Sequence, residues 1–127
     1  SLVKELKSIA RNKDKKISAA VFPYPEISRE MVLQDWSLWD LDIICPMNYH
    51  HFYDVDIDWI ANSVLKGIQY KKPDGVYLSG LFLGALSPSK LNDAIKSCLK
   101  SGADGVCLFN DECLTEEHIN IIKSFRQ

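Results

Sequence analysis

The stretch "SPSKLNDAIKSCLKSGADGVCLFN", residues 87–110, joins a helix to a buried strand through a short turn. Ser87 suits a helix N-cap, and Pro88 suits the first helical position. Gly102 marks the end of that helix, because glycine is common just past a helix C-terminus. Residues 105–110 are then apolar with little alternation, as in a strand covered on both faces. The stretch therefore predicts one helix–strand step of an α/β protein.

Three further apolar runs resemble the strand at 105–110. They lie at residues 16–22, 41–47 and 75–83, so the four strand starts are roughly 25 to 35 residues apart. Helical patterns occupy residues 1–12, 28–40, 56–71, 87–102 and 114–127, with Ser28, Ser87 and Thr115 as expected N-caps. A helix followed by four strand–helix units predicts a parallel sheet with right-handed crossovers.

Two architectures fit this order of elements. One is a small open sheet with helices on both faces; the other is four consecutive units, or half, of a (β/α)8 TIM barrel, which needs about 250 residues. No Gly-rich phosphate fingerprint follows the first strand, which counts against a dinucleotide-binding sheet. We therefore expect residues 1–127 to form a single half-barrel. Its outer strands would be unpaired, so we expect a second copy or four further units upstream to pair with them.

The composition excludes several classes of partner. The chain is 46% apolar and 25% charged with a net charge of -2, and it shows no basic patch that would indicate nucleic acid. No apolar run approaches the roughly 20 residues that cross a bilayer. The four cysteines form no CxxC pair, and Cys45 and Cys107 lie in apolar runs where we expect them to be buried. No metal site and no cofactor is expected.

Polar side chains follow the second strand at the point where it ends. Active sites of TIM barrels lie at the C-terminal ends of the strands, so this position is a candidate site. Asn48, Tyr49 and His50 supply an amide, an aromatic ring with a hydroxyl, and an imidazole, which are groups that bind sugars. These three residues are therefore predicted to bind substrate. His51 and Phe52 are expected to fold back and pack.

Two other strand ends carry candidate residues. Tyr24 and Glu26 follow the first strand and are further substrate-binding candidates, although Glu26 would also suit the start of a helix. Asp111 and Glu112 follow the fourth strand and are the candidate catalytic acids; the alternative is an ordinary solvated loop. The third strand is followed by "FLGALSP", residues 82–88, which contains no acid.

Four phrases of the sequence resemble a known family. They are "SAAVFP" (18–23), "QDWSLW" (34–39), "DIICPMNYH" (42–50) and "GADGVCLF" (102–109). In this order they are similar to the C-terminal half of bacterial glycosyl-hydrolase-like TIM barrels, the family-ten-like glycoside hydrolases abundant in Bacteroides. The resemblance implies a secreted or periplasmic parent that hydrolyses glycosidic bonds of poly- or oligosaccharides. It also implies that most acids of the site lie on the missing half, so this chain would be inactive alone.

At one position the sequence departs from the pattern of barrel glycosidases. Many retaining barrel glycosidases carry a nucleophilic carboxylate at the end of the seventh strand, and residues 82–88 offer none at the corresponding place. The usual mechanism with two carboxylates is therefore in doubt. Two alternatives stay open: a non-catalytic carbohydrate-binding barrel, or a small open α/β domain that binds a phosphorylated metabolite at residues 87–90.

Overall fold

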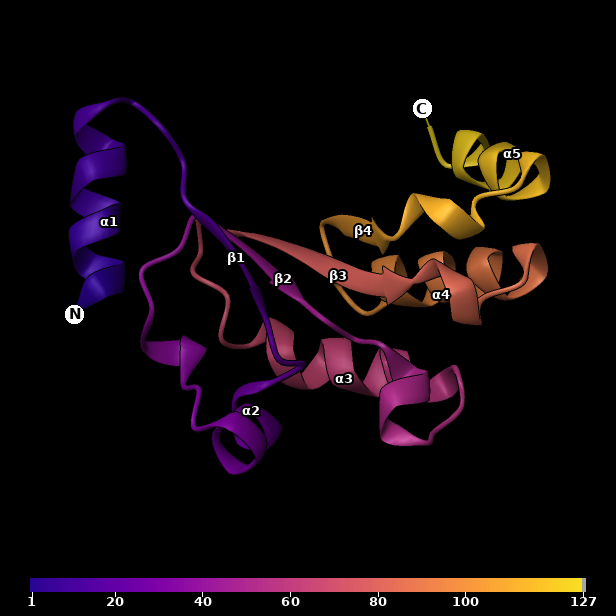
Figure 1. The fold of residues 1–127 in the computed structure, drawn as a ribbon, viewed down its shortest axis with the longest axis horizontal. Coiled ribbons are helices and arrows are strands. Elements are labelled where there is room, and N and C mark those ends of the chain that lie inside the picture. Colours follow the sequence, from indigo (N-terminus) through magenta and orange to yellow (C-terminus); the bar gives the residue numbers. More distant parts are fainter. Residues whose placement is uncertain (127) are drawn as a thin grey trace.

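The computed structural model describes residues 1–126 and contains one parallel sheet of four strands. The strands are β1 (Ser18–Val21), β2 (Ile43–Pro46), β3 (Val76–Phe82) and β4 (Gly105–Phe109), and they lie side by side in the order β1-β2-β3-β4 (Figure 1). Each strand falls within its predicted range. The predicted α/β fold, a parallel sheet with surrounding helices, is confirmed.

Five helices accompany the sheet. They are α1 (Leu2–Asn12), α2 (Pro25–Val32), α3 (Asp58–Ile68), α4 (Pro88–Lys100) and α5 (Glu116–Ser124). Four short 3-10 turns lie between these elements: η1 (Trp36–Leu38), η2 (His50–Tyr53), η3 (Leu83–Ala85) and η4 (Asp111–Cys113). The last three follow β2, β3 and β4, so they occupy the edge of the sheet where a barrel would hold its site.

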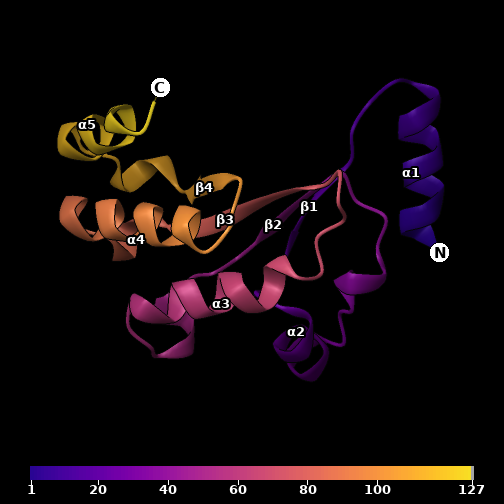
Figure 2. The same ribbon diagram turned by 180° about the vertical axis from the view of Figure 1, so that it is seen from behind.

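The strand order bears on the choice between the two architectures. Each strand lies beside its neighbour in the sequence, and right-handed crossovers that always step in one direction place their helices on one face. A doubly wound sheet would instead reverse its strand order at a switch point. Figures 1 and 2 show α3 and α4 along the same side of the sheet. This arrangement is compatible with half of a (β/α)8 barrel.

The hydrophobic core lies between the sheet and these helices. Its strand residues alternate along the chain, as expected when one face of a strand is buried. The largest contributors from the sheet and the two helices are all at most 7% exposed: Val21, Ile44, Tyr77, Leu81, Ile60, Val64, Leu91, Ala94 and Ile95. Apolar burial of this kind is the main source of the stability of the fold.

The opposite face of the sheet, here called the inner face, is uncovered within residues 1–126. Ala20 and Cys107 are exposed, Phe109 is 50% exposed, and Cys45 and Leu78 are half-buried. The expectation that Cys107 is buried is therefore wrong for this chain, and Cys45 is buried only in part. Their side chains share the face that no helix covers.

The region around α2 differs from its prediction. The helix does not start after Ser28: Tyr24 is its N-cap, and Pro25 occupies the first turn. It ends early because Leu33 adopts a left-handed conformation with φ of 55°. The chain then enters η1, where the indole of Trp36 donates to the carbonyl oxygen of Phe22 at 2.9 Å. Burying this tryptophan against the end of β1 replaces the single helix predicted for 28–40.

Two predicted caps are present. The Ser87 hydroxyl accepts a hydrogen bond from the Lys90 amide at 3.4 Å. The Thr115 hydroxyl accepts from the His118 amide at 3.3 Å. Both bonds satisfy amides that a helix start would leave without partners.

Helix α1 lies at the end of the sheet where the strands begin (Figure 1). Lys7, which is 5% exposed, forms an ion pair with Asp42 just before β2. The same carboxylate accepts from the Ile17 amide at 2.8 Å. These two contacts lower the pKa of Asp42, the Lys7 hydrogen bond most. None of the helices in residues 1–126 is both long and apolar enough to cross a membrane.

Candidate functional site

The carboxyl ends of the strands meet at one edge of the sheet. The register pairs Phe82 at the end of β3 with Phe109 at the end of β4. Met47, directly after β2, forms a bridge with Gly80 of β3. Because the strands are parallel, residues that follow them are brought together at this edge.

Gly80 allows β2 and β3 to approach closely at this edge. A Cβ at this position would lie 2.7 Å from the carbonyl oxygen of Pro46 and 3.3 Å from the Cα of Met47. Real side chains do not tolerate the first distance, and the atom in the way is backbone, which cannot rotate aside. The absence of a side chain therefore positions the residues that follow β2.

Asn48 is an internal bridge. Its side chain is fully buried, and its amide nitrogen donates to the Ser79 hydroxyl at 2.9 Å and lies 3.5 Å from the Tyr77 hydroxyl. Its amide oxygen accepts from the Ser63 hydroxyl at 2.6 Å. Direct ligand contact by Asn48 does not fit this geometry, because its polar groups are already paired and none reaches the surface. It positions the next residues instead.

Tyr49 lies among aromatic rings from three segments. Its ring stacks with Phe109 at 6.0 Å between centroids and meets Phe82 and Phe52 edge-on at 5.7 Å each. Burial raises the pKa of Tyr49, with the neighbouring thiols of Cys107 and Cys45 as smaller contributors. The phenol is therefore a neutral hydrogen-bonding group on an aromatic surface.

His50 is almost completely enclosed. It is 8% exposed, and its Nδ1 atom is buried without a hydrogen-bond partner among residues 1–126. Burial lowers the pKa of His50, and the nearby charges of His51 and Lys90 lower it further. A buried nitrogen with no partner carries a desolvation cost, which makes the neutral imidazole the preferred form.

His51 and Phe52 pack against neighbouring aromatic rings, as expected, but they are not buried. Both are exposed, Phe52 to 64%. The His51 ring lies 4.2 Å from Phe52 and 4.5 Å from Phe82 between centroids. The turn η2 directs His50 inward, and the two side chains that follow lie outward over Phe82.

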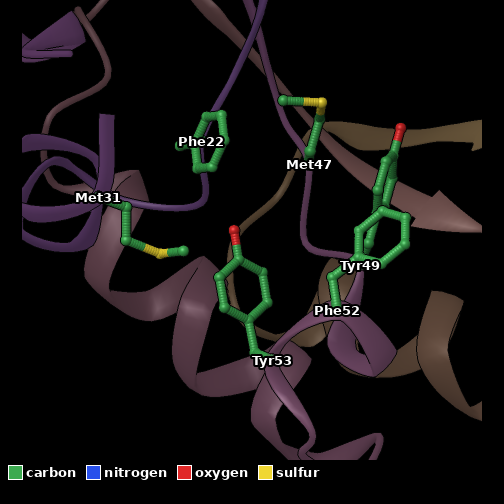
Figure 3. Close-up of a pocket in the computed structure, with 6 residues that line it drawn as sticks. All are labelled: Phe22, Met31, Met47, Tyr49, Phe52 and Tyr53. Carbon is green, nitrogen blue, oxygen red and sulfur yellow. The ribbon is translucent and has the colours of Figure 1, made fainter. Parts of the chain in front are cut away.

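A cavity of about 260 Å³ opens beside Tyr49 (Figure 3). Its lining comes from the residue after β1, from α2 and from the segment after β2: Phe22, Met31, Met47, Tyr49, Phe52 and Tyr53. Tyr53 is held in place by Trp59, whose ring stacks on it at 4.9 Å. Of the seven residues predicted for the site, only Tyr49 lines this cavity.

Tyr24 and Glu26 lie toward the helices. The Lys66 ammonium lies 4.8 Å from the centre of the Tyr24 ring, a cation–π contact. Glu26 is exposed in the first turn of α2 and accepts a hydrogen bond from the Tyr70 hydroxyl at 2.5 Å. That bond is the main reason why the pKa of Glu26 is lowered. The position of Glu26 in the first turn of α2 is compatible with the alternative considered from the sequence, support of the helix start.

Asp111 and Glu112 form the turn η4 after β4, and both are exposed. They follow Phe109, which stacks on Tyr49, and the cis peptide bond between Phe109 and Asn110. Neither carboxylate lines the cavity, but both stand at the same edge of the sheet as the aromatic rings.

Sequence reasoning missed a set of residues with a simple signal. A large apolar side chain stands at the end of each strand or directly after it: Phe22, Met47, Phe82 and Phe109. In a strand covered on both faces such residues are indistinguishable from core, so they were read as part of the buried runs. Their position at the last residue of each strand, or directly after it, was the signal.

Three comparisons, with models of protein families, with curated proteins and with solved structures, find nothing that matches this chain. Within residues 1–126, no three His, Cys, Asp or Glu side chains are grouped in a way that could hold a metal ion. The residues at the strand ends are therefore the structural basis for assigning a function.

Proposed function

We propose that this chain is the C-terminal part of a glycoside-hydrolase-like barrel, and that its strand ends bind a poly- or oligosaccharide. The observation that carries the proposal is the aromatic surface at the carboxyl edge of the sheet, where Tyr49, Phe82 and Phe109 pack beside the cavity. Ligands of barrel enzymes bind at this edge.

Aromatic rings suit carbohydrate because the C–H faces of a sugar are flat and apolar, while its hydroxyls need polar partners. Phe52 and His51 present exposed rings at the rim. Tyr49 and Tyr53 add hydroxyl groups, which can donate and accept. The combination supports stacking of a sugar on the rim with its hydroxyls directed toward the tyrosines.

Hydrolysis by the usual mechanism requires two carboxyl groups on either side of the glycosidic bond. Asp111 and Glu112 are the candidates for one of these roles, as acid or base. The turn η3 after β3 consists of Leu83, Gly84 and Ala85 and offers no partner. The chain is therefore proposed to bind without hydrolysing by itself, with the second acid supplied by the rest of a parent barrel.

The second candidate is a non-catalytic carbohydrate-binding barrel, which the missing acid after β3 favours. A phosphate-binding role at residues 87–90 is less well supported. The Ser87 hydroxyl already accepts from the Lys90 amide, so the start of α4 is capped by its own side chain.

The partner surface is part of the proposal. The inner face carries exposed Cys107 and half-exposed Phe109, and β1 and β4 each have a free edge. Either a second copy or four further units upstream would cover this face and pair these edges. Sedimentation of this chain tests the first option, because a stable monomer at low concentration contradicts it. A secreted or periplasmic location for the parent follows only from the resemblance.

The test of binding is a glycan panel applied to this chain and three variants. Tyr49→Phe removes a hydroxyl and is expected to weaken binding about fivefold, the usual effect of one neutral hydrogen bond. Asp111→Asn tests the carboxylate after β4. Leu38→Ala is the matched control, because Leu38 is 77% exposed in η1, outside the site. If no glycan binds, or if both site variants bind like the control, the proposal is wrong.

A further inference from the structure

The cavity beside Tyr49 has an unusual lining for a carbohydrate site. None of its six side chains carries a charge, and four are aromatic: Phe22, Tyr49, Phe52 and Tyr53. A pyranose ring buried here would leave several hydroxyls without partners, which costs free energy for each of them. The interior of the cavity therefore favours an apolar group over a hydroxylated ring.

The size of the cavity indicates how large that group is. An apolar cavity of about 150 Å³ in a protein interior is enough to take up benzene. This cavity measures about 260 Å³, so it has room for an aromatic ring with a substituent. It is also open to solvent on one side, since Phe52 and Met31 are 64% and 55% exposed.

The two methionines favour an aromatic occupant. Met31 comes from α2 and Met47 follows β2, and their side chains lie on either side of Phe22 in Figure 3. Unbranched thioethers adapt to irregular shapes and make favourable contacts with ring edges. A flat ring that contacts both thioethers would also meet the aromatic ring of Phe22.

One polar group points into the cavity. In Figure 3 the hydroxyl of Tyr53 is directed toward Phe22 and the space between the methionines. Stacking against Trp59 fixes the Tyr53 ring, and burial raises the pKa of its phenol. Tyr53 is therefore a fixed, neutral group that can donate one hydrogen bond to an oxygen on the occupant.

We propose that this cavity binds a neutral aromatic ring bearing one oxygen substituent, as in the aglycone of an aryl glycoside. The ring lies against Phe22, in contact with Met31 and Met47, and its oxygen meets the Tyr53 hydroxyl. The link to a glycoside rests on the proposed function; the preference for an oxygen-bearing aromatic ring rests on the cavity alone. The two parts can therefore fail separately.

The test measures binding of phenol by calorimetry or ligand-observed NMR, with methyl glucoside and benzoate as comparison ligands. Phe52→Ala and Met31→Ala each remove a wall and should weaken phenol binding about tenfold or more, as loss of a well-packed contact does. Both residues are more than half exposed, so these changes spare the core. Tyr53→Phe should weaken phenol binding about fivefold while leaving toluene unaffected. Leu38→Ala should bind phenol like the wild type.

The binding results test the aromatic-ring inference and the proposed function separately. Phenol that does not bind, or that binds Phe52→Ala and Met31→Ala as well as the wild type, overturns the inference. Benzoate that binds as tightly as phenol also overturns it, because an uncharged apolar cavity cannot stabilise a carboxylate. If methyl glycosides bind and phenol does not, the proposed function stands and this inference fails. If phenol binds and no glycan does, the reverse holds.

Discussion

Ser63 on α3 donates a hydrogen bond of 2.6 Å to the amide oxygen of Asn48, and both side chains are completely buried. The amide nitrogen of Asn48 donates to Ser79 on β3. Asn48, in the segment that follows β2, thus connects that segment to β3 and to α3. Since Tyr49 and His50 follow it directly, this bridge determines which way the candidate site residues point.

Replacing Asn48 by Ala should lower the free energy of unfolding by about 2 to 3 kcal/mol, because buried hydroxyls of Ser63 and Ser79 lose their partner. Chemical denaturation measures the change. The control is Asn62→Ala on α3, next to Ser63. The Asn62 side chain is exposed, so the change in the free energy of unfolding should stay within about 0.5 kcal/mol. Equal effects of the two substitutions would show that the buried bridge contributes nothing.

Gly80→Ala should be destabilising by about 1 to 3 kcal/mol, the range for overpacking a well-packed site. The added Cβ would stand 2.7 Å from a backbone oxygen of Pro46, so β3 would have to move away from the end of β2. Gly84→Ala is the matched control. Gly84 is exposed, and the nearest atoms there are side-chain atoms of Phe82 and Cys113 and not backbone, so less has to move. Urea unfolding of both variants tests this prediction. If Gly80→Ala lowers the free energy of unfolding no more than Gly84→Ala does, β2 and β3 do not need this close approach.

Local signals explain which parts of the fold could be predicted from the sequence. Ser87 and Thr115 cap helices through hydrogen bonds to residues three positions away. Both partners therefore lie in the same short stretch of sequence. The strands were predicted because short apolar runs recur along the chain at intervals of roughly 25 to 35 residues. The start of α2 was missed because Pro25 and Ser28 are both acceptable near a helix start, and the helix begins at Pro25 with Tyr24 as its N-cap.

The site was harder because its assignment depends on distant partners. Asn48, Tyr49 and His50 are adjacent, and nothing in their order separates the buried residue from the one that packs at the cavity. The separation comes from Ser63 and Ser79, which lie 15 and 31 residues further along the chain. Such pairing is a property of the folded sheet, and a single sequence does not reveal it.

The start of α5 gives a prediction about a cap. Thr115 and His118 form a reciprocal pair: the Thr115 hydroxyl accepts from the His118 amide, and Nδ1 of His118 accepts from the Thr115 amide at 3.2 Å. Because Nε2 of His118 lies 2.8 Å from the Leu86 carbonyl oxygen, it is the nitrogen that carries the proton and donates. Thr115→Ala should therefore lower the free energy of unfolding by about 1 kcal/mol, the usual worth of an N-cap.

Thr115→Ser is the control for this cap, because it keeps the hydroxyl. It should retain most of the stability and most of the protection of the His118 amide against hydrogen exchange. The prediction is wrong if the Ala and Ser variants are equally stable, or if the exchange of that amide is the same in both.

His50 predicts how stability depends on pH. Its ordinary pKa of 6.5 is lowered in the folded chain by burial, and by His51 and Lys90, against a smaller opposing effect of Asp56. Below pH 6.5 the unfolded chain therefore takes up a proton at His50 before the folded chain does. Because stability rises with pH wherever the unfolded state binds more protons, it should fall as the pH drops from 6.5 through the lowered folded-state value.

The measurement is the free energy of unfolding between about pH 7.5 and 5 for the wild type and His50→Gln, a range that spans the ordinary titration of histidine. Glutamine does not titrate, so the variant should lose part of the decline seen in the wild type on the acidic side. His51→Gln is the matched control: it also removes one imidazole, but an exposed one, and should keep most of the wild-type decline, because burial is the main cause of the His50 shift and His51 a smaller one. If His50→Gln and His51→Gln lose stability in parallel with the wild type as the solution is acidified, protonation of the enclosed His50 ring does not oppose folding. Its unpartnered Nδ1 would then have to gain a compensating contact in solution, such as an ordered water.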